Sequence, residues 1–413
     1  MSRGFFSSEE TTARVSLPTI PQCGACGLYK QCQSPKMEPY GKGRKKIMVV
    51  GSFPDDQDDT RESMRRNRAF YELELTLDRN GIEKHDCVWT SAMICHPKDD
   101  GKLWRKQVEY CRPNVFNAIA EHKPKAIILL GDEAIKSVLG KLYKNNPGNS
   151  DQWKGFTIPS QELNSWVCPV VHPSFFTTDK RRAKTAVVER LLFEQHIAKA
   201  VEVAENYPWE TVPDFKKQVK LLWNADEVDA EITAMYEDGK PVSFDYETNM
   251  LKPHNANSYI RCVSLSNSKR TIAFEWNKST MRSVRSILRD PNVPKIAANM
   301  KFEYSWTLAK LGFEIRNWLH DPILGMHVID NRPLICGLKF QSFVEYGLPK
   351  YNRDIERYLR SGEKGCYAPN RVGDANLEAL MLYCGLDALL AYKISMRQRK
   401  LLGLPLYHPL QRS

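Results

Sequence analysis

Short apolar runs that alternate with helical segments leave this chain few possible folds. In the first half, the runs that we interpret as strands are residues 46–50, 87–94, 126–130 and 167–171. Strands that alternate with helices predict a parallel sheet with helices on both faces. Ligands of such a sheet bind at the carboxyl ends of its strands. The residues at those ends are Gly51, Ser91, Gly131 and His172.

The second half follows the turn-rich segment 206–213 and predicts a different sheet. A helix at 225–238 precedes an apolar strand, and two further strands at 261–266 and 270–276 predict an antiparallel pair. Three strands in succession, with helices following, indicate a mixed sheet of the ribonuclease H-like type. The predicted organisation is an arm at 1–20, a parallel α/β/α domain at 21–208 and a mixed-sheet domain at 209–413. Residues 52–67 are predicted to be a long loop.

Charge and cysteine content narrow the class of protein. The 413 residues suffice for about two or three domains. A net charge of +11 favours a polyanionic partner, most simply nucleic acid, although a basic surface that binds nothing is the alternative. No apolar run is long enough to predict a membrane span, and no secretory signal is predicted. Eleven cysteines in a chain of this size favour reduced thiols and a metal site over a disulfide framework.

Four cysteines have the spacing of a metal site. Cys23 and Cys26 form a Cys-x-x-Cys pair, and Cys95 and Cys111 are the natural second pair. Four thiolates suit zinc or an iron–sulfur cluster, and the spacing alone does not separate the two. The alternative is a set of buried core cysteines with one chance Cys-x-x-Cys.

Residues 20 to 200 resemble the iron–sulfur uracil-DNA glycosylases of family four. The resemblance rests on the four cysteines, on Ile-Met-Val-Val-Gly ending at Gly51, on the segment Thr-Ser-Ala-Met-Ile-Cys-His-Pro, and on a His-Pro-Ser motif at His172. It implies a [4Fe–4S] cluster on the cysteines Cys23, Cys26, Cys95 and Cys111.

The glycosylase motifs themselves depart from that family. Ser52 stands where the family has an acidic residue, an ungapped count places Arg65 at the base-stacking Phe, and Ser91 replaces the uracil-reading Asn. Only His172 of the final motif remains. A glycosylase needs a pocket that stacks and reads the flipped base. We therefore expect a cluster-stabilised scaffold without uracil excision.

The strand at 241–248 carries two carboxylates, Asp245 and Glu247, which share a face because side chains alternate along a strand. Such a pair suits Mg²⁺ or Mn²⁺, although a chance Asp-x-Glu is the alternative. Downstream, Glu303 follows a predicted strand at 295–298. Tyr383 and Asp387 lie four residues apart on a predicted helix, so they also share a face.

These blocks, over residues 220 to 400, resemble the proofreading 3′–5′ exonuclease domain of family A DNA polymerases, a DEDD exonuclease with a tyrosine in its third motif. The resemblance implies that two Mg²⁺ or Mn²⁺ ions bind Asp245, Glu247, Glu303 and Asp387, and that Tyr383 positions the attacking water. Glu303 stands where the family usually has Asp. The alternative is a degraded domain that only binds DNA.

Other residues near these blocks are predicted to bind a single-stranded 3′ end. They are Asn299, Lys301, Tyr304, Trp306, Arg332, Lys339 and Phe340. The alternative is a solvated face with core aromatics. Asp321 is predicted to cap a helix that begins at Pro322.

Polymerase I-like proteins carry a polymerase domain after the exonuclease, whereas this chain ends 26 residues after Asp387. We therefore expect an exonuclease that proofreads in trans for a separately encoded DNA polymerase. The alternatives are a non-catalytic, polymerase-associated DNA-binding subunit and an active uracil repair enzyme fused to a nuclease. The arrangement resembles phage replication proteins, which implies the cytoplasm of an infected bacterium.

Overall fold

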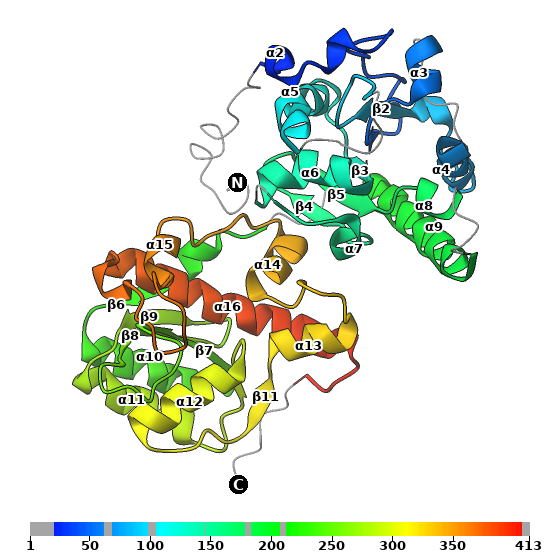
Figure 1. Ribbon diagram of the computed structural model, residues 1–413. Helices are drawn as coiled ribbons and strands as arrows, with labels where there is room; N and C mark the ends of the chain where they lie inside the picture. The colour runs from blue at the N-terminus through cyan, green and yellow to red at the C-terminus, as the bar shows by residue number, and fades with distance from the viewer. Residues whose placement is uncertain are drawn as a thin grey trace. The chain divides into compact units, whose positions relative to one another are not determined.

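The structure, a computed structural model, describes residues 20–61, 68–97, 105–144, 146–177, 183–206 and 212–406. The chain forms two compact units, which are coloured from blue to green and from green to red in Figure 1. The first unit extends to Val212 and also includes Phe343–Pro349, whereas the second comprises Pro213–Ser342 and the chain from Lys350. Of the predicted arm, residues 1–19 lie outside the described residues.

The first unit contains a five-stranded sheet in the order β2-β1-β3-β5-β4. Its strands are β1 (Ile47–Gly51), β2 (Cys87–Ser91), β3 (Ala126–Leu130), β4 (Ile158–Ser160) and β5 (Ser165–Val170). The four predicted strands pair in parallel, which confirms the parallel sheet. The antiparallel edge strand β4 was not predicted, because three residues are too few to show a period.

Helices cover both faces of this sheet. The helices of the first unit are α2 (Cys23–Cys26), α3 (Asp56–Arg61), α4 (Arg68–Asp78), α5 (Arg105–His122), α6 (Gly131–Leu142), α7 (Ser150–Trp153), α8 (Ser174–Thr177) and α9 (Ala183–Glu205). Side chains of α4 and α9 share one core with Ile47 and Val49 of β1. The helices α5 and α6 pack together and contact β2 and β1.

The helix α3 corrects the prediction that residues 52–67 form a loop. Its first turn is stabilised by Asp55, because the Asp55 carboxylate accepts hydrogen bonds from the backbone N–H groups of Gln57 and Asp58, both at 2.9 Å. Residues 62–67 lie outside the described residues.

The second unit contains a six-stranded mixed sheet in the order β11-β10-β7-β8-β9-β6. Its strands are β6 (Lys220–Leu222), β7 (Val242–Thr248), β8 (Ile260–Ser266), β9 (Thr271–Glu275), β10 (Lys295–Ile296) and β11 (Trp318–His320). The strands β7, β8 and β9 are antiparallel, and β10 and β11 continue the sheet in parallel with β7. The predicted ribonuclease H-like sheet is thereby confirmed.

The two faces of β7 have different partners. The helices of the second unit are α10 (Ala225–Asp238), α11 (Lys278–Arg289), α12 (Met300–Leu311), α13 (Pro322–Ile329), α14 (Leu338–Tyr346, which continues into the first unit), α15 (Glu356–Leu359) and α16 (Leu377–Leu401). Phe244 and Tyr246 join the core beneath α10, α11 and α12. The intervening residues of β7 therefore face α16, which packs across β7, β8 and β9.

Hydroxyl groups fix α16 on the sheet. Ser243 Oγ of β7 donates to the carbonyl of Ala388 at 2.7 Å, and Ser264 Oγ of β8 donates to the carbonyl of Cys384 at 2.7 Å. By length and mean hydropathy α16 could cross a bilayer, but its most apolar window is 78% buried within the protein, as expected of a core helix.

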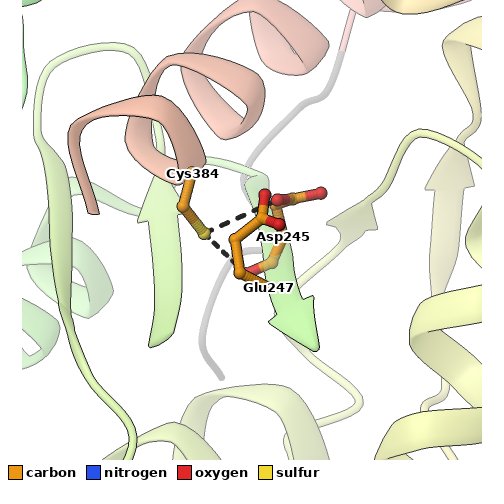
Figure 2. Close-up of side chains that lie close together, drawn as sticks. All are labelled: Asp245, Glu247 and Cys384. Carbon is orange, nitrogen blue, oxygen red and sulfur yellow. Dashed lines mark hydrogen bonds between the residues drawn. The ribbon is translucent and has the colours of Figure 1, made fainter. Parts of the chain in front are cut away.

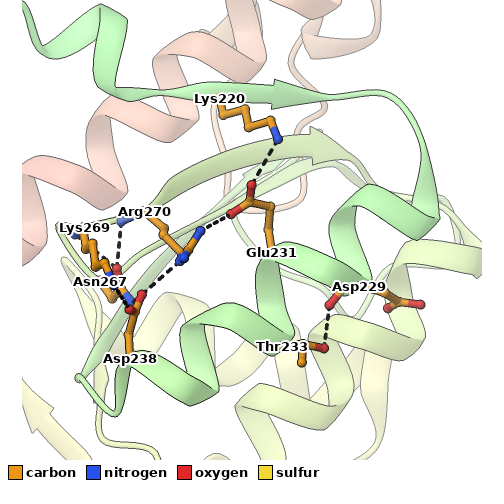
Figure 3. A network of polar contacts seen from close by, with 8 residues as sticks. All are labelled: Lys220, Asp229, Glu231, Thr233, Asp238, Asn267, Lys269 and Arg270. Carbon is orange, nitrogen blue, oxygen red and sulfur yellow. Dashed lines mark hydrogen bonds and ion pairs between the residues drawn. The ribbon is translucent and has the colours of Figure 1, made fainter.

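A polar network joins α10 to β6 and to the turn between β8 and β9 (Figure 3). Glu231 accepts from Lys220 at 3.0 Å and from Arg270 at 3.1 Å, and Asp238 accepts from Arg270 and Asn267, each at 3.0 Å. This network holds α10 against β6 and against the turn between β8 and β9.

Candidate active site and metal centres

The acidic residues predicted from the sequence converge between β7, α12 and α16. Asp245 and Glu247 extend from β7 toward Cys384 of α16, as Figure 2 shows. One ligand atom from each of these three residues lies within 4.8 Å of the other two. Cys384 Sγ donates to Asp245 Oδ2 at 3.5 Å. The neighbouring Tyr383 and the buried Asp387 come from the same stretch of α16.

The carboxyl groups of this cluster repel one another. Burial, together with the charge of Asp387, raises the pKa of Asp245 to about 7. Burial and the neighbouring carboxylates raise the pKa of Glu247 and of Glu303 well above their ordinary values. Hard cations bind such oxygen clusters and favour their ionised form.

Glu303 contributes an oxygen that the protein leaves unsatisfied. It lies in the first turn of α12 and is 2% exposed. Its Oε2 atom has no hydrogen-bond partner among the described residues. A buried, unpaired carboxylate oxygen is costly unless a ligand satisfies it. The four carboxylates therefore fit a divalent metal site.

Two side chains that the sequence motifs did not predict at this site, Lys339 and Tyr351, bind Asp387. The Lys339 ammonium, on α14, donates to Asp387 Oδ2 at 2.5 Å and to the Tyr383 hydroxyl at 2.5 Å. The Tyr351 hydroxyl donates to the other oxygen, Asp387 Oδ1. Lys339 was predicted to bind a DNA strand; the structure places its ammonium on the acidic cluster instead.

The four predicted cysteines of the first unit line one cavity, together with Leu28, Lys36 and Met93. Cys95 Sγ accepts from the Lys36 backbone N–H at 3.3 Å. Cys111 Sγ accepts from the Ile94 backbone N–H at 3.4 Å and from the Asn114 amide at 3.3 Å. Such donors stabilise thiolate sulfur, whereas burial, the largest effect, raises the pKa of Cys95 to about 12.

The four thiols suit either zinc or an iron–sulfur cluster. A single tetrahedral zinc, with Zn–S bonds of ~2.3 Å, brings its sulfurs to about 3.8 Å from one another. Among the described residues, which include all four cysteines, no three of these sulfurs lie within 4.8 Å of one another. An iron–sulfur cluster separates its cysteines more widely, because irons and sulfides stand between them.

The predicted glycosylase pocket surrounds Gly131 at the carboxyl ends of the strands. A Cβ atom at Gly131 would lie 3.0 Å from His172 Cβ and 3.6 Å from Ser52 Oγ. Ser52 Oγ donates to Glu133 Oε2 at 3.0 Å. The buried Ser91 is in register with Gly51 across β1 and β2.

His172 is the one predicted pocket residue that matches the glycosylase motif. Its Nδ1 atom lies 2.7 Å from Ser174 Oγ, and the Phe70 ring meets its imidazole edge-on at 6.5 Å. Burial lowers the pKa of His172 to about 4, so the imidazole is neutral at physiological pH. Arg65 lies outside the described residues.

Each half of the chain matches a known protein family. Residues 38–194 match the family model described as Uracil DNA glycosylase superfamily, and residues 224–402 match the model described as 3′-5′ exonuclease. The chain joins a uracil-DNA glycosylase superfamily domain to a 3′-5′ exonuclease domain.

Individual relatives cover only parts of the chain. The Type-4 uracil-DNA glycosylase of Pyrobaculum aerophilum is 30% identical over 122 residues, which span 29% of this chain and 61% of that protein. RNase D of Escherichia coli is similar to 45% of this chain over 46% of its own, with 13% identity and a TM-score of 0.32. The Nibbler EXO domain of Aedes aegypti is similar to 46% of this chain over 91% of its own, with 13% identity and a TM-score of 0.32.

The exonuclease domain has a groove of about 610 Å³ beside α12. Asn299, Lys301 and Tyr304, all predicted to bind a strand, line it together with Lys252 and Trp318. Glu303, on the same helix, does not line this groove and is 2% exposed.

Two predicted strand-binding residues have other contacts. Trp306 is 0% exposed in the core of the exonuclease domain, so it packs the core and cannot stack on a base in this structure. Arg332 pairs with Asp330, with its Nη2 atom 2.6 Å from Asp330 Oδ2. Phe340 is also buried.

Asp321 caps α13, as predicted, by accepting from the Ile323 N–H at 2.8 Å. It also accepts from the backbone N–H groups of Asn299 and Met300, at 3.2 and 3.0 Å. Asp321 therefore fixes the start of α12, the helix that carries Glu303.

Proposed function

We propose that the exonuclease domain is a metal-dependent nuclease that removes nucleotides from the 3′ end of DNA. The observation that carries the proposal is the buried cluster of Asp245, Glu247, Glu303 and Asp387, with one Glu303 oxygen lacking a partner among the described residues. These four residues would hold two Mg²⁺ or Mn²⁺ ions. Two such ions supply an activated water and stabilise the leaving 3′-oxygen.

The protein's own groups then orient the reactants. Burial and the charges of Asp387 and Glu247 raise the pKa of Tyr383 well above that of a free tyrosine. Its hydroxyl therefore stays protonated, and it can donate a hydrogen bond that orients the attacking water. Asp321 holds the first turn of α12, so it keeps the Glu303 carboxylate in the site.

The groove beside α12 is the proposed path of the single strand. Lys252 and Lys301 supply positive charge for the phosphates, and Tyr304 and Trp318 supply rings on which bases can stack. The net charge of +11 favours the same polyanionic substrate.

For the glycosylase-superfamily domain, the proposal is a scaffold that carries a [4Fe–4S] cluster on Cys23, Cys26, Cys95 and Cys111 and does not excise uracil. Ser52 and Ser91 stand at two positions where such enzymes need an acid and a base-reading amide. The whole protein would then proofread in trans for a separate DNA polymerase in phage-type replication, with this domain contributing contacts to DNA or to the polymerase.

The test is an end-labelled oligonucleotide assay with Mg²⁺, Mn²⁺ or EDTA. A 5′-labelled strand should shorten stepwise in metal, and EDTA should stop the reaction. Asp245→Asn should lower the rate by about a thousandfold or more, the scale on which removal of a central catalytic group acts. Glu237→Gln is the matched control, because Glu237 is an exposed carboxylate on α10, the opposite side of the sheet.

Full activity in Asp245→Asn, or activity that survives EDTA, would contradict the site. An RNA strand of the same sequence, run in parallel, measures whether DNA is preferred. Addition of a candidate polymerase with a mismatched primer end tests the proofreading role separately.

A further inference from the structure

Lys339 occupies the acidic site with its positive charge. Its ammonium lies 2.5 Å from Asp387 Oδ2 and 2.5 Å from the Tyr383 hydroxyl, and 4.5 Å above the Tyr383 ring. The Lys339 side chain is 29% exposed, whereas that of Asp387 is 6% exposed. The charge is thus directed inward, to the carboxylates, rather than into solvent.

Both oxygens of Asp387 are engaged by the protein. Lys339 binds Oδ2, and the Tyr351 hydroxyl binds Oδ1. A divalent ion on Oδ2 would lie close to the ammonium, and the two cations would repel each other, so the ion binds less tightly while the ammonium remains. Departure of one donor therefore favours Asp387 as a metal ligand.

Lys339 is the donor that can leave. Its four-carbon stem is flexible and ends in a compact charge that water solvates well. Tyr351, by contrast, has a ring that packs against the Tyr383 ring, with centroids 5.9 Å apart. Its neutral hydroxyl can remain on Oδ1 beside a metal bound to Oδ2.

We propose that Lys339 is a resident counter-cation of the exonuclease site. It holds Asp387 in position before metal binds, and it yields Asp387 Oδ2 to the divalent ion. This inference rests on the proposed function, because it takes Asp387 as a metal ligand. Lys339 is a positioning residue on this account: it stabilises the unloaded site and weakens metal binding.

The experiment measures Mn²⁺ binding without DNA, from the electron paramagnetic resonance signal of free Mn²⁺. The proteins are wild type, Lys339→Met and Tyr351→Phe. Lys339→Met should bind Mn²⁺ about tenfold more tightly than wild type. The gain is smaller than the repulsion between two cations in contact, because the wild-type ammonium moves away when Mn²⁺ binds. Tyr351→Phe removes a hydrogen bond but no charge, so its affinity should change by less than about threefold.

Thermal unfolding in EDTA provides a second readout. Lys339→Met should unfold at a lower temperature than wild type without metal, and Mn²⁺ should raise its transition more than it raises that of wild type. Lys339→Arg, which keeps the charge, should bind Mn²⁺ as wild type does. If Lys339→Met does not fold, Lys339→Gln takes its place.

Equal or weaker Mn²⁺ binding in Lys339→Met would overturn the counter-cation role and leave the proposed nuclease intact. Absence of Mn²⁺ binding in wild type and variant alike would overturn the metal site, and this role with it.

Discussion

The two domains each bury a group of polar side chains, but they satisfy those side chains differently. In the glycosylase-superfamily domain the polar groups pair within the pocket: Ser52 donates to Glu133, and His172 pairs with Ser174. In the exonuclease domain the carboxylates repel one another, and a Glu303 oxygen lacks a partner among the described residues. The polar groups of the first pocket thus have partners within the protein, whereas the acidic site has one ammonium, that of Lys339, for four carboxyl groups.

The cysteine cavity is the candidate metal site of the glycosylase-superfamily domain. Its sulfurs accept hydrogen bonds from Lys36, Ile94 and Asn114, which prepares thiolates for a metal. The first domain thus combines a candidate metal site with a pocket in which Ser52 and His172 have partners within the protein.

The largest expected effect comes from loss of the cluster. Cys95→Ser should remove the iron and unfold the glycosylase-superfamily domain, because binding of a structural metal can supply about 10 kcal/mol or more of folding free energy. The measurements are iron and sulfide content, visible absorbance and thermal unfolding. Exonuclease activity of the same sample shows whether the second domain depends on the first.

Cys32→Ser is the matched control for the cluster. Cys32 lies beside the cavity and donates to the Leu28 carbonyl, but it is not one of the four predicted ligands. The variant should keep its iron. One zinc ion per chain in the wild type, in place of about four irons, would correct the cofactor and weaken the argument from sulfur spacing.

The next largest effect is a pH dependence of the unloaded exonuclease domain. The pKa of Asp245 is about 7 in the folded protein, above its ordinary value of 3.8. A carboxyl whose pKa rises on folding stabilises the fold fully at low pH and loses that contribution as pH rises from about 4 to about 7. In EDTA, the unfolding temperature of this domain should therefore fall by several degrees between pH 5.5 and 8.

Metal and mutation separate this effect from other titrations. Mg²⁺ should reduce the fall, because a bound cation favours the ionised carboxylates. Asp245→Asn should reduce the fall in EDTA without abolishing it, because Glu247 and Glu303, whose pKa values are also raised, remain. The same slope in Asp245→Asn and wild type would show that other groups carry it.

Much of the exonuclease site could be predicted because its residues obey local periods. Asp245 and Glu247 share a face at a spacing of two, and Tyr383 and Asp387 at a spacing of four. Trp306 was predicted to bind the DNA strand, but it is buried in the core. The helical period could have predicted this burial. Trp306 lies three residues from the buried Glu303, so it shares the buried side of α12.

The remaining contacts depend on tertiary structure. Lys339 and Tyr351 reach Asp387 from segments 36 to 48 residues away, with no local pattern that marks their partner. Glu133 likewise meets Ser52 across 81 residues. The short strand β4 and the capped helix α3 were missed because three to six residues are too few to establish a period.

The smallest expected effect is that of the glycosylase pocket on uracil, which should be nil. The assay uses uracil-containing DNA, both single-stranded and double-stranded, and alkali cleaves any abasic sites that form. The protein carries Asp245→Asn, so that the nuclease leaves the DNA intact. Release should not exceed that of a uracil-free control, and His172→Ala should change nothing, because Ser52 and Ser91 stand where the glycosylase motifs have an acid and a base-reading amide.

Glu133→Gln makes this prediction sharper. A carboxylate does lie next to Ser52 in the structure, that of Glu133. It belongs to α6 and not to the motif that follows β1. Release of uracil that Glu133→Gln abolished would show that Glu133 acts as the acidic residue that is absent at Ser52. The glycosylase-superfamily domain would then be an active enzyme, which contradicts the proposed difference between the two domains. If release is absent in every variant, the Ser52–Glu133 hydrogen bond is structural, since it joins the segment after β1 to the first turn of α6.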